Sequence, residues 1–218
     1  MTDDTTWRAA PPVEPLCDTW GVKALAGFWC ITPSFAAPPL STLELNAWFT
    51  TAVHESLEAF AHVTRAWRVS GATIAEPNVA PVALERERQE SCEAYLQRVH
   101  EAIHDYPAPL YAVEVKVDVF AYFRTPESRT RPMQGWARLG DNFRIWAVPE
   151  HQDVGLCFNV RHTLFNPFSQ DGEDNYELYA LNQPLLETAL RGWEQKFGPI
   201  TDFEGQSGIY HYGFSTNV

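Results

Sequence analysis

Basic residues are scarce in this chain of 218 residues. It has 16 Lys and Arg against 28 Asp and Glu, which gives a formal net charge of −12. Binding to a nucleic acid or to an anionic lipid surface depends on clusters of Lys and Arg. We therefore expect neither nucleic acid nor a membrane as a partner. A basic protein is the kind of partner that such a charge attracts.

Cysteine is also scarce, and its spacing gives no sign of a metal site. Cys17, Cys30, Cys92 and Cys157 lie far apart, and the sequence contains no C-x-x-C pair. Zinc knuckles and dense disulfide frameworks use closely paired cysteines, so neither is predicted. We expect all four to be buried free thiols, on the model of Cys30 and Cys157, each of which lies between two apolar residues.

The chain lacks the apolar segments that target a protein to a membrane. No run approaches the roughly 18 consecutive apolar residues of a transmembrane helix. The beginning of the chain is polar and proline-rich, without the basic and apolar regions of a signal peptide. We interpret residues 1–15 as a flexible tail and residues 16–218 as a single domain, and we expect a cytoplasmic location.

Strand periodicity, in contrast, is strong between residues 111 and 162. From Tyr111 to Phe123, apolar residues alternate with mostly polar ones, which is typical of a half-buried strand. Gly140, Asp141 and Asn142 predict a hairpin turn, because glycine and asparagine tolerate positive φ. Further strands are predicted over residues 133–139, 143–148 and 154–163. Together these segments predict an antiparallel β-meander of four or more strands.

About three helices are predicted beside this meander. Ser41 and Glu44 match a capping box at the start of the first helix. The second is expected over roughly residues 82–104. The third is expected to begin at Asn182 as the capping residue, with Pro184 in its first turn.

The remaining segments add shorter strands to this picture. They are expected over residues 22–32, 61–70 and 208–215. The predicted fold class is therefore α+β, with the meander packed against the helices in one domain.

One metalloenzyme motif is present. His100, Glu101 and His104 match H-E-x-x-H, in which two histidines one helical turn apart bind Zn²⁺ and the glutamate acts as a general base. Zinc also needs a third protein ligand. The candidates for it are Glu114, His151 and His162. The apolar stripe of this helix places Glu101 nearly opposite the core, so we favour a solvated helix flank and predict no cofactor.

Other enzyme signatures are missing. The sequence has no G-x-S-x-G, no G-x-x-x-x-G-K-[ST] and no G-x-G-x-x-G. The acidic segment with Asp171, Glu173, Asp174 and Glu177 lacks the spacing of a calcium-binding loop. No catalytic or metal-binding residue is assigned, and a non-enzymatic role is favoured.

Aromatic residues are plentiful on the predicted strands. Phe120, Tyr122, Trp136 and Trp146 fall on neighbouring segments of the meander. A core face beneath the helices is the favoured interpretation. An exposed aromatic face would instead form a pocket for a ligand or a surface for a protein.

Three functional hypotheses follow. The first is a non-enzymatic acidic domain that binds a protein partner. A small, acidic chain without a catalytic motif resembles the immunity proteins that neutralise bacterial toxins, which implies a basic toxin as the partner. The alternatives are a zinc-dependent hydrolase that uses His100, Glu101 and His104, and a small-molecule binding domain with an aromatic pocket on the sheet.

Overall fold

The computed structural model describes residues 11–13, 26–33, 41–73, 78–128, 130–148, 153–169, 172–205 and 208–215. Within these residues the chain forms three helices and ten strands. The helices are α2 (Thr42–Ala59), α3 (Cys92–His104) and α4 (Tyr176–Phe197). The strands are β1 (Gly27–Ile31), β2 (Thr64–Ala72), β3 (Val82–Glu85), β4 (Ala112–Phe123), β5 (Met133–Ala137), β6 (Asn142–Val148), β7 (Asp153–Val160), β8 (Asp202–Gly205), β9 (Ile209–Tyr210) and β10 (Gly213–Phe214).

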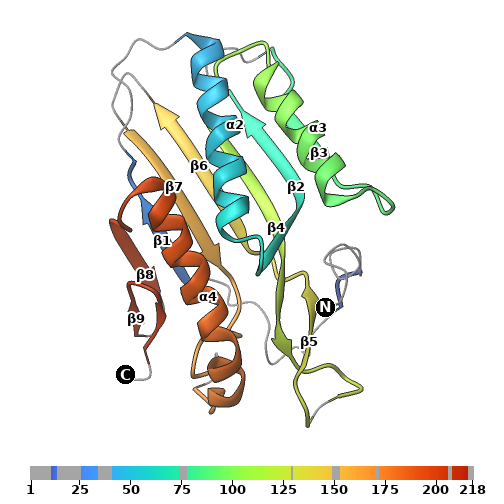
Figure 1. Ribbon diagram of the computed structural model, residues 1–218, viewed down its shortest axis with the longest axis vertical. Coiled ribbons are helices and arrows are strands. Elements are labelled where there is room, and N and C mark those ends of the chain that lie inside the picture. The colour runs from blue at the N-terminus through green and yellow to red at the C-terminus, as the bar shows by residue number, and fades with distance from the viewer. Residues whose placement is uncertain are drawn as a thin grey trace.

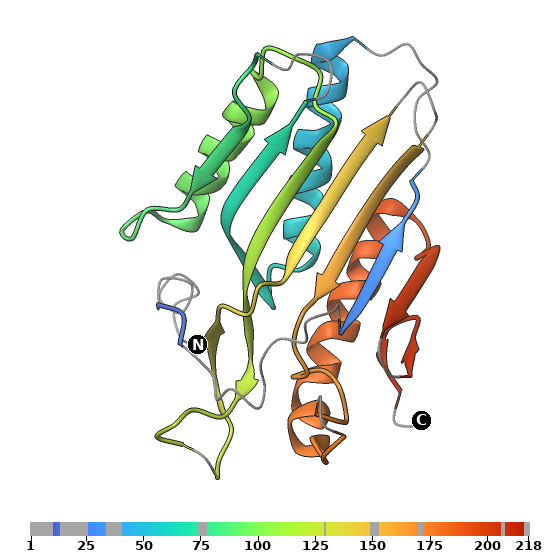
Figure 2. The same cartoon turned by 180° about the vertical axis from the view of Figure 1, so that it is seen from behind.

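Eight of these strands form one antiparallel sheet. Their order is β3-β2-β4-β6-β7-β1-β8, and β5 pairs with β4. The three helices lie on one face of the sheet, and no described helix covers the other face (Figures 1 and 2). Strands β9 and β10 form a small hairpin that contacts α4. The predicted α+β fold, an antiparallel sheet packed against three helices, is confirmed.

The alternation in β4 explains why the helices cover only one face. Val113, Val115, Val117 and Val119 are completely buried in the core beneath the helices. Successive side chains of a strand point to opposite faces, so the residues between these valines point away from the helices. We call the face without helices the open face.

An aromatic cluster joins two helices to the sheet. The ring of Phe60, at the end of α2, lies 4.6 Å from that of Phe158 and 5.0 Å from that of Phe143. Trp193 of α4 completes the cluster, 5.8 Å from Phe60, and donates from Nε1 to Ser56 Oγ. Each such side chain contributes about 1.5–3 kcal/mol through burial, so this cluster fixes how α2 and α4 lie on the sheet.

The start of α2 confirms the predicted capping box. Ser41 Oγ accepts from the Glu44 N–H, and Glu44 Oε2 accepts from the Ser41 N–H at 2.8 Å. The Ser41 hydroxyl also donates to Glu44 Oε2 at 2.7 Å, and the hydrogen bonds from this hydroxyl and from the Ser41 N–H lower the pKa of Glu44. The predicted strand over residues 61–70 is confirmed as β2.

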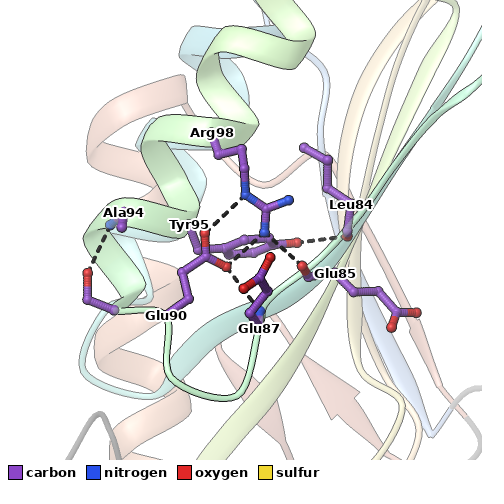
Figure 3. A network of polar contacts seen from close by, with 8 residues as sticks. Leu84, Glu85, Glu87, Glu90, Ala94, Tyr95 and Arg98 are labelled. Carbon is purple, nitrogen blue, oxygen red and sulfur yellow. Dashed lines mark hydrogen bonds and ion pairs between the residues drawn. The ribbon is translucent and has the colours of Figure 1, made fainter.

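The prediction of one helix over residues 82–104 is wrong in its first half. Val82–Glu85 is strand β3, which pairs with β2 and covers a strand edge that a helix would leave unpaired. Helix α3 begins after Ser91, whose Oγ accepts from the Ala94 N–H. Figure 3 shows Arg98 of α3 donating to Glu90 and to the backbone oxygen of Glu85. These tertiary contacts hold the charged residues 86–90 beside β3, and these residues are not part of a helix.

The predicted hairpin turn at residues 140–142 is also wrong. Strands β5 and β6 both run antiparallel to β4 and pair with it one after the other. The Asp141 oxygen accepts from the Val117 N–H at 3.0 Å, so the chain stays beside β4 between the two strands. Gly140 does adopt a positive φ of 85°, but it joins two consecutive strand segments and does not reverse the chain.

Helix α4 begins earlier than predicted. Its first residue is Tyr176, and Pro184 lies inside it. Asn182, predicted as the capping residue, is completely buried within the helix and binds the backbone of β4. Pro184 therefore predicted the start of the helix too late. The helix already includes Leu178, which lies on its buried face.

The prediction of free thiols is wrong for two of the four cysteines. Cys30 of β1 and Cys157 of β7 are directly opposite in register and form a disulfide. Their positions are far apart in sequence, and only strand pairing brings the Cα atoms to 4.2 Å. Disulfides persist mainly in oxidising compartments, so this bond does not support the expected cytoplasmic location. Cys92 is a free thiol, and Cys17 lies outside the described residues.

Only residues 11–13 of the predicted N-terminal tail are described. The N–H of Val13 donates to the Trp136 oxygen at 2.7 Å, so this short piece contacts β5. Of the helices within the described ranges, none is long and apolar enough to cross a membrane.

Candidate functional site

The open face presents an ordered grid of polar and aromatic side chains. In the centre of the sheet, Glu114 of β4 is opposite Arg144 of β6, which in turn is opposite Cys157 of β7. Two residues earlier on β6, Asn142 is opposite Asn159. Residues opposite each other in an antiparallel pair point to the same face, so strand pairing alone assembles this group.

A hollow of about 540 Å³ lies on this part of the open face. Its size falls within the roughly 300–1,000 Å³ of small-molecule sites. It is lined by Phe28, Tyr111, Glu114, Asn142, Arg144, Trp146, Asp153, Cys157, Asn159 and Arg161. The lining combines three aromatic rings with charged and amide groups, a combination that suits a ligand with both apolar and polar parts.

The indole of Trp146 lies directly on Gly155. A Cβ atom at residue 155 would lie 2.2 Å from Trp146 Cζ2, so only glycine permits this approach. Trp146 Nε1 donates to Asp153 Oδ1 at 3.1 Å, which fixes the orientation of the ring. The side chain is half-buried and lines the hollow. Trp146 therefore forms a rigid aromatic wall.

The amide of Asn142 is incompletely satisfied. Asn142 is 6% exposed, and its Nδ2 donates to Glu114 Oε1 at 2.9 Å. Its Oδ1 is buried and accepts no hydrogen bond from the described residues. An unsatisfied buried acceptor costs about 1–3 kcal/mol, so a donor supplied by a ligand or by water would be favoured there.

The disulfide belongs to the same hollow as this amide. Cys157 lines the hollow, and its bond to Cys30 holds β1 against β7. Phe28, two residues before Cys30, is opposite Asn159 and lines the same hollow. The disulfide thus fixes the strand that supplies one of the three aromatic rings.

The other end of the open face is occupied by a buried ion-pair cluster. Asp118 is completely buried and accepts from Arg65 Nε at 3.1 Å and from Arg138 Nε at 2.7 Å. The Arg65 guanidinium lies 4.4 Å from the Trp136 ring centroid, and that of Arg138 lies 4.1 Å from Trp67. Burial lowers the pKa of Arg65, although Asp118 opposes this shift. This packing makes the cluster structural.

The four aromatic residues singled out in the sequence therefore lie in three different places. Trp136 is 2% exposed and packs with Phe120 at 5.1 Å, beside the ion-pair cluster. The backbone of Tyr122 binds Asn182 of α4. Trp146 lines the hollow. Trp136 and Trp146 both lie outside the predicted core face beneath the helices.

The H-E-x-x-H residues lie on the outer side of α3. His100 and Glu101 are exposed, and Glu101 accepts from Gln97. His104 is half-buried and hydrogen-bonds Asp105, while its ring lies 6.0 Å from that of His100. Among the described residues, no third His, Cys, Asp or Glu gathers with these two histidines.

The proposed third ligands lie elsewhere. Glu114 lines the hollow on the open face, and His151 is outside the described residues. His162 is completely buried, and its Nε2 hydrogen-bonds Asp141 Oδ2 at 2.6 Å. Its Nδ1 accepts from the Leu164 N–H at 3.2 Å, so Nε2 carries the proton. Both nitrogens are engaged, which makes this pair a structural link.

The other described groups of interest are smaller or already paired. A hollow of about 170 Å³ between α2, α3 and β2 includes Cys92 and His54 but is below the size of usual ligand sites. His54, Glu55 and Glu58 lie close enough together to hold a cation. Both carboxylates of that group, however, form salt bridges with Lys196.

The acidic segment around the start of α4 is exposed where it is described. Glu173 and Asp174 face solvent, and Glu177 pairs with Arg124 at 2.5 Å. Asp171 lies outside the described residues.

Sequence reasoning identified Trp146 but missed most of the hollow. The alternation of Asn142, Arg144 and Trp146 is visible in the sequence and places them on one face. Their neighbours on β1, β4 and β7 depend on register, which periodicity does not reveal. Comparison with known proteins adds no precedent, because no protein-family model, no characterised protein and no solved structure matches this chain.

Proposed function

We propose that this protein is a non-enzymatic binding domain that holds a small-molecule ligand in the hollow of its open face. The observation that carries the proposal is the hollow itself, about 540 Å³ in volume and walled by the fixed indole of Trp146. Ligand sites are typically concave, partly aromatic and largely preformed. This hollow is concave and includes three aromatic rings. It is also preformed, since its floor is a hydrogen-bonded sheet.

Binding is favoured over catalysis by the state of the lining groups. Glu114 accepts from Asn142 and Asp153 accepts from Trp146, so each carboxylate is engaged by a neighbour. Cys157 is in a disulfide. The part of the lining that the structure describes contains no histidine, serine or free thiol to act as a base or nucleophile.

The charge of −12 supports a second candidate function, the binding of a basic protein partner. Exposed carboxylates occur on all three helices, for example Glu58, Glu101 and Glu177. Such binding would weaken steeply with added salt, because surface charges are screened within about 10 Å at 0.1 M ionic strength. A pull-down from the native host in low salt and in high salt tests it.

Ligand titration followed by NMR tests the first proposal. The ¹⁵N-labelled protein is titrated with benzyl alcohol, benzoate and phenyl phosphate at millimolar concentrations. We expect at least one of them to shift the indole N–H signal of Trp146, assigned by its loss in Trp146→Phe. A spectrum in which none of the three probes shifts that signal would overturn the proposal.

A further inference from the structure

We propose that the ligand of this hollow carries an anionic group, a carboxylate or a phosphate, held between Arg144 and Arg161. This inference rests on the proposed function and adds the chemical class of the ligand. Two features of the described residues support it: the placement of two arginines in the hollow, and their lack of salt bridges with carboxylates. The buried acceptor between them adds a separate requirement, a hydrogen-bond donor on the ligand.

The two arginines flank the centre of the hollow. Arg144 is on β6, opposite Cys157, and Arg161 immediately follows β7. Arg161 is held in place by its N–H, which donates to Asp141 Oδ1 at 2.8 Å. Its Cδ lies 3.7 Å from where a Cβ of Gly140 would be, so it is level with that residue of the neighbouring segment.

The spacing suits one small ligand. Residues 140 and 144 are separated by about 13 Å along the strand direction, at roughly 3.3 Å per residue. Asn142 and Asn159 lie between the two arginines, and all four residues line the hollow. Long arginine side chains from its two ends can therefore reach the same group.

Arg144 differs from the other arginines in regular structure. Each of the others within a described helix or strand forms a salt bridge with a carboxylate; these are Arg65, Arg68, Arg98 and Arg191. Arg144 and Arg161 form no salt bridge with any carboxylate of the described ranges, and both are exposed. In a protein with 12 more acidic than basic residues, carboxylates are plentiful. Two guanidinium groups without salt bridges in one hollow are therefore a site for an external anion.

The two carboxylates of the hollow are engaged by other side chains. Asp153 is the first residue of β7, at the opposite end of that strand from Arg161, and accepts from Trp146 Nε1. Glu114 is opposite Arg144 in register, but its Oε1 accepts from Asn142 Nδ2.

The buried acceptor adds a second requirement for the ligand. Asn142 lies between the two arginines, and its Oδ1 accepts no hydrogen bond within the described part of the chain. A ligand that carries a hydroxyl or amine donor beside its anionic group would satisfy that oxygen.

The test compares charged and neutral ligands of similar shape. Benzoate, phenyl phosphate and benzyl alcohol are titrated by the NMR assay in buffer of low ionic strength. We expect the better of the two anions to bind about 10-fold or more tightly than the alcohol, since hydrogen bonds to charged groups are roughly twice as strong as neutral ones. The ratio of benzoate to phenyl phosphate affinity identifies the preferred anionic group.

Substitutions assign the effect to the two arginines. Arg144→Gln and Arg161→Gln should each weaken anion binding about 10-fold, a clearly larger change than the same substitutions cause in benzyl alcohol binding. Arg68→Gln is the matched control, because Arg68 lies on β2, pairs with Glu85 and does not line the hollow. It should change anion affinity less than about 2-fold, through the loss of one screened charge. Unchanged amide spectra confirm that each variant is folded.

The outcomes distinguish the inference from the proposed function. If benzyl alcohol binds as tightly as the anions, the hollow is a ligand site but the inference of an anionic ligand is wrong. The same conclusion follows if Arg144→Gln and Arg161→Gln weaken anion binding no more than Arg68→Gln does. If no probe shifts the Trp146 signal, the proposed function itself fails.

Discussion

The carboxamide of Asn182 binds the backbone of Tyr122 through both of its polar atoms. Its Oδ1 accepts from the Tyr122 N–H at 2.7 Å, and its Nδ2 donates to the Tyr122 oxygen at 2.8 Å. Nδ2 also donates to the Leu164 oxygen at 3.1 Å. One side chain of α4 thus takes the place of a neighbouring strand at this point of β4, and it anchors the helix to the sheet.

Asn182→Ala should lower the free energy of unfolding by about 2–4 kcal/mol, because it leaves three backbone groups without partners at a buried site. Urea unfolding followed by circular dichroism measures the change. Gln195→Ala, an exposed position on the same helix, is the control and should stay within about 0.5 kcal/mol of the original protein. Equal stability of the two variants would show that the Asn182 contacts do not anchor the helix.

The disulfide should contribute strongly to stability. It closes a loop between residues 127 positions apart, so it restricts the unfolded chain. Replacing both Cys30 and Cys157 with serine should lower the free energy of unfolding by about 2–5 kcal/mol. Cys92→Ser is the control, because that thiol is free. If the original protein unfolds at the same urea concentration with and without reductant, this prediction is wrong.

Gly155→Ala should displace the Trp146 ring, because the added Cβ would overlap Cζ2. We expect a loss of about 1–3 kcal/mol in unfolding free energy, as for other overpacked sites. Gly135→Ala is the control, since the nearest atom to its Cβ position is Phe123 Cζ at an ordinary 3.5 Å. In a Trp146→Ala background the cost of Gly155→Ala should disappear. A cost that persists there would mean that the indole is not what excludes a side chain at residue 155.

Glu194 should make stability depend on pH. Burial raises its pKa, but hydrogen bonds from Tyr212, the Ile200 N–H and His211 outweigh that effect and lower it. A carboxyl group with a lowered folded pKa stabilises the fold above its unfolded pKa, and the stabilisation is lost as the pH falls through the folded pKa.

Glu194→Gln should therefore unfold at lower urea concentration than the original protein at pH 7, and the difference should shrink on acidification below about pH 4. Urea midpoints measured across this range give the result. Glu173→Gln, at an exposed position, is the control. A midpoint difference that stays constant with pH would show that the carboxylate charge is not responsible.

Local patterns predicted the parts of the fold that depend on neighbouring residues. The capping box at Ser41 is correct, because its bonds join residues three positions apart. The alternation from Tyr111 to Phe123 is correct, because its valines lie on one face of a strand. Asn182 and Asn142 were misread, since an asparagine suits a helix cap or a turn, and nothing local shows that its amide will bind a distant strand.

The candidate site was less predictable than the fold. Trp146 stood out as an aromatic residue on a strand, but its role depends on Gly155 of the neighbouring strand. From the sequence alone, Arg144 cannot be distinguished from any other arginine on an exposed strand face. Its significance comes from the salt bridges that the other helix and strand arginines of the described ranges form and it does not.

The amino-acid sequence by itself determined the long alternating strand, the capped first helix and the aromatic residues of the meander, because periodicity and capping act over a few residues. Only the tertiary structure decided which of those aromatic residues meet a hollow, which cysteines are bonded and which described arginines lack salt bridges. Each of these depends on strand register, which brings residues such as Cys30 and Cys157 together from distant parts of the chain. The open face is therefore a property of the assembled sheet.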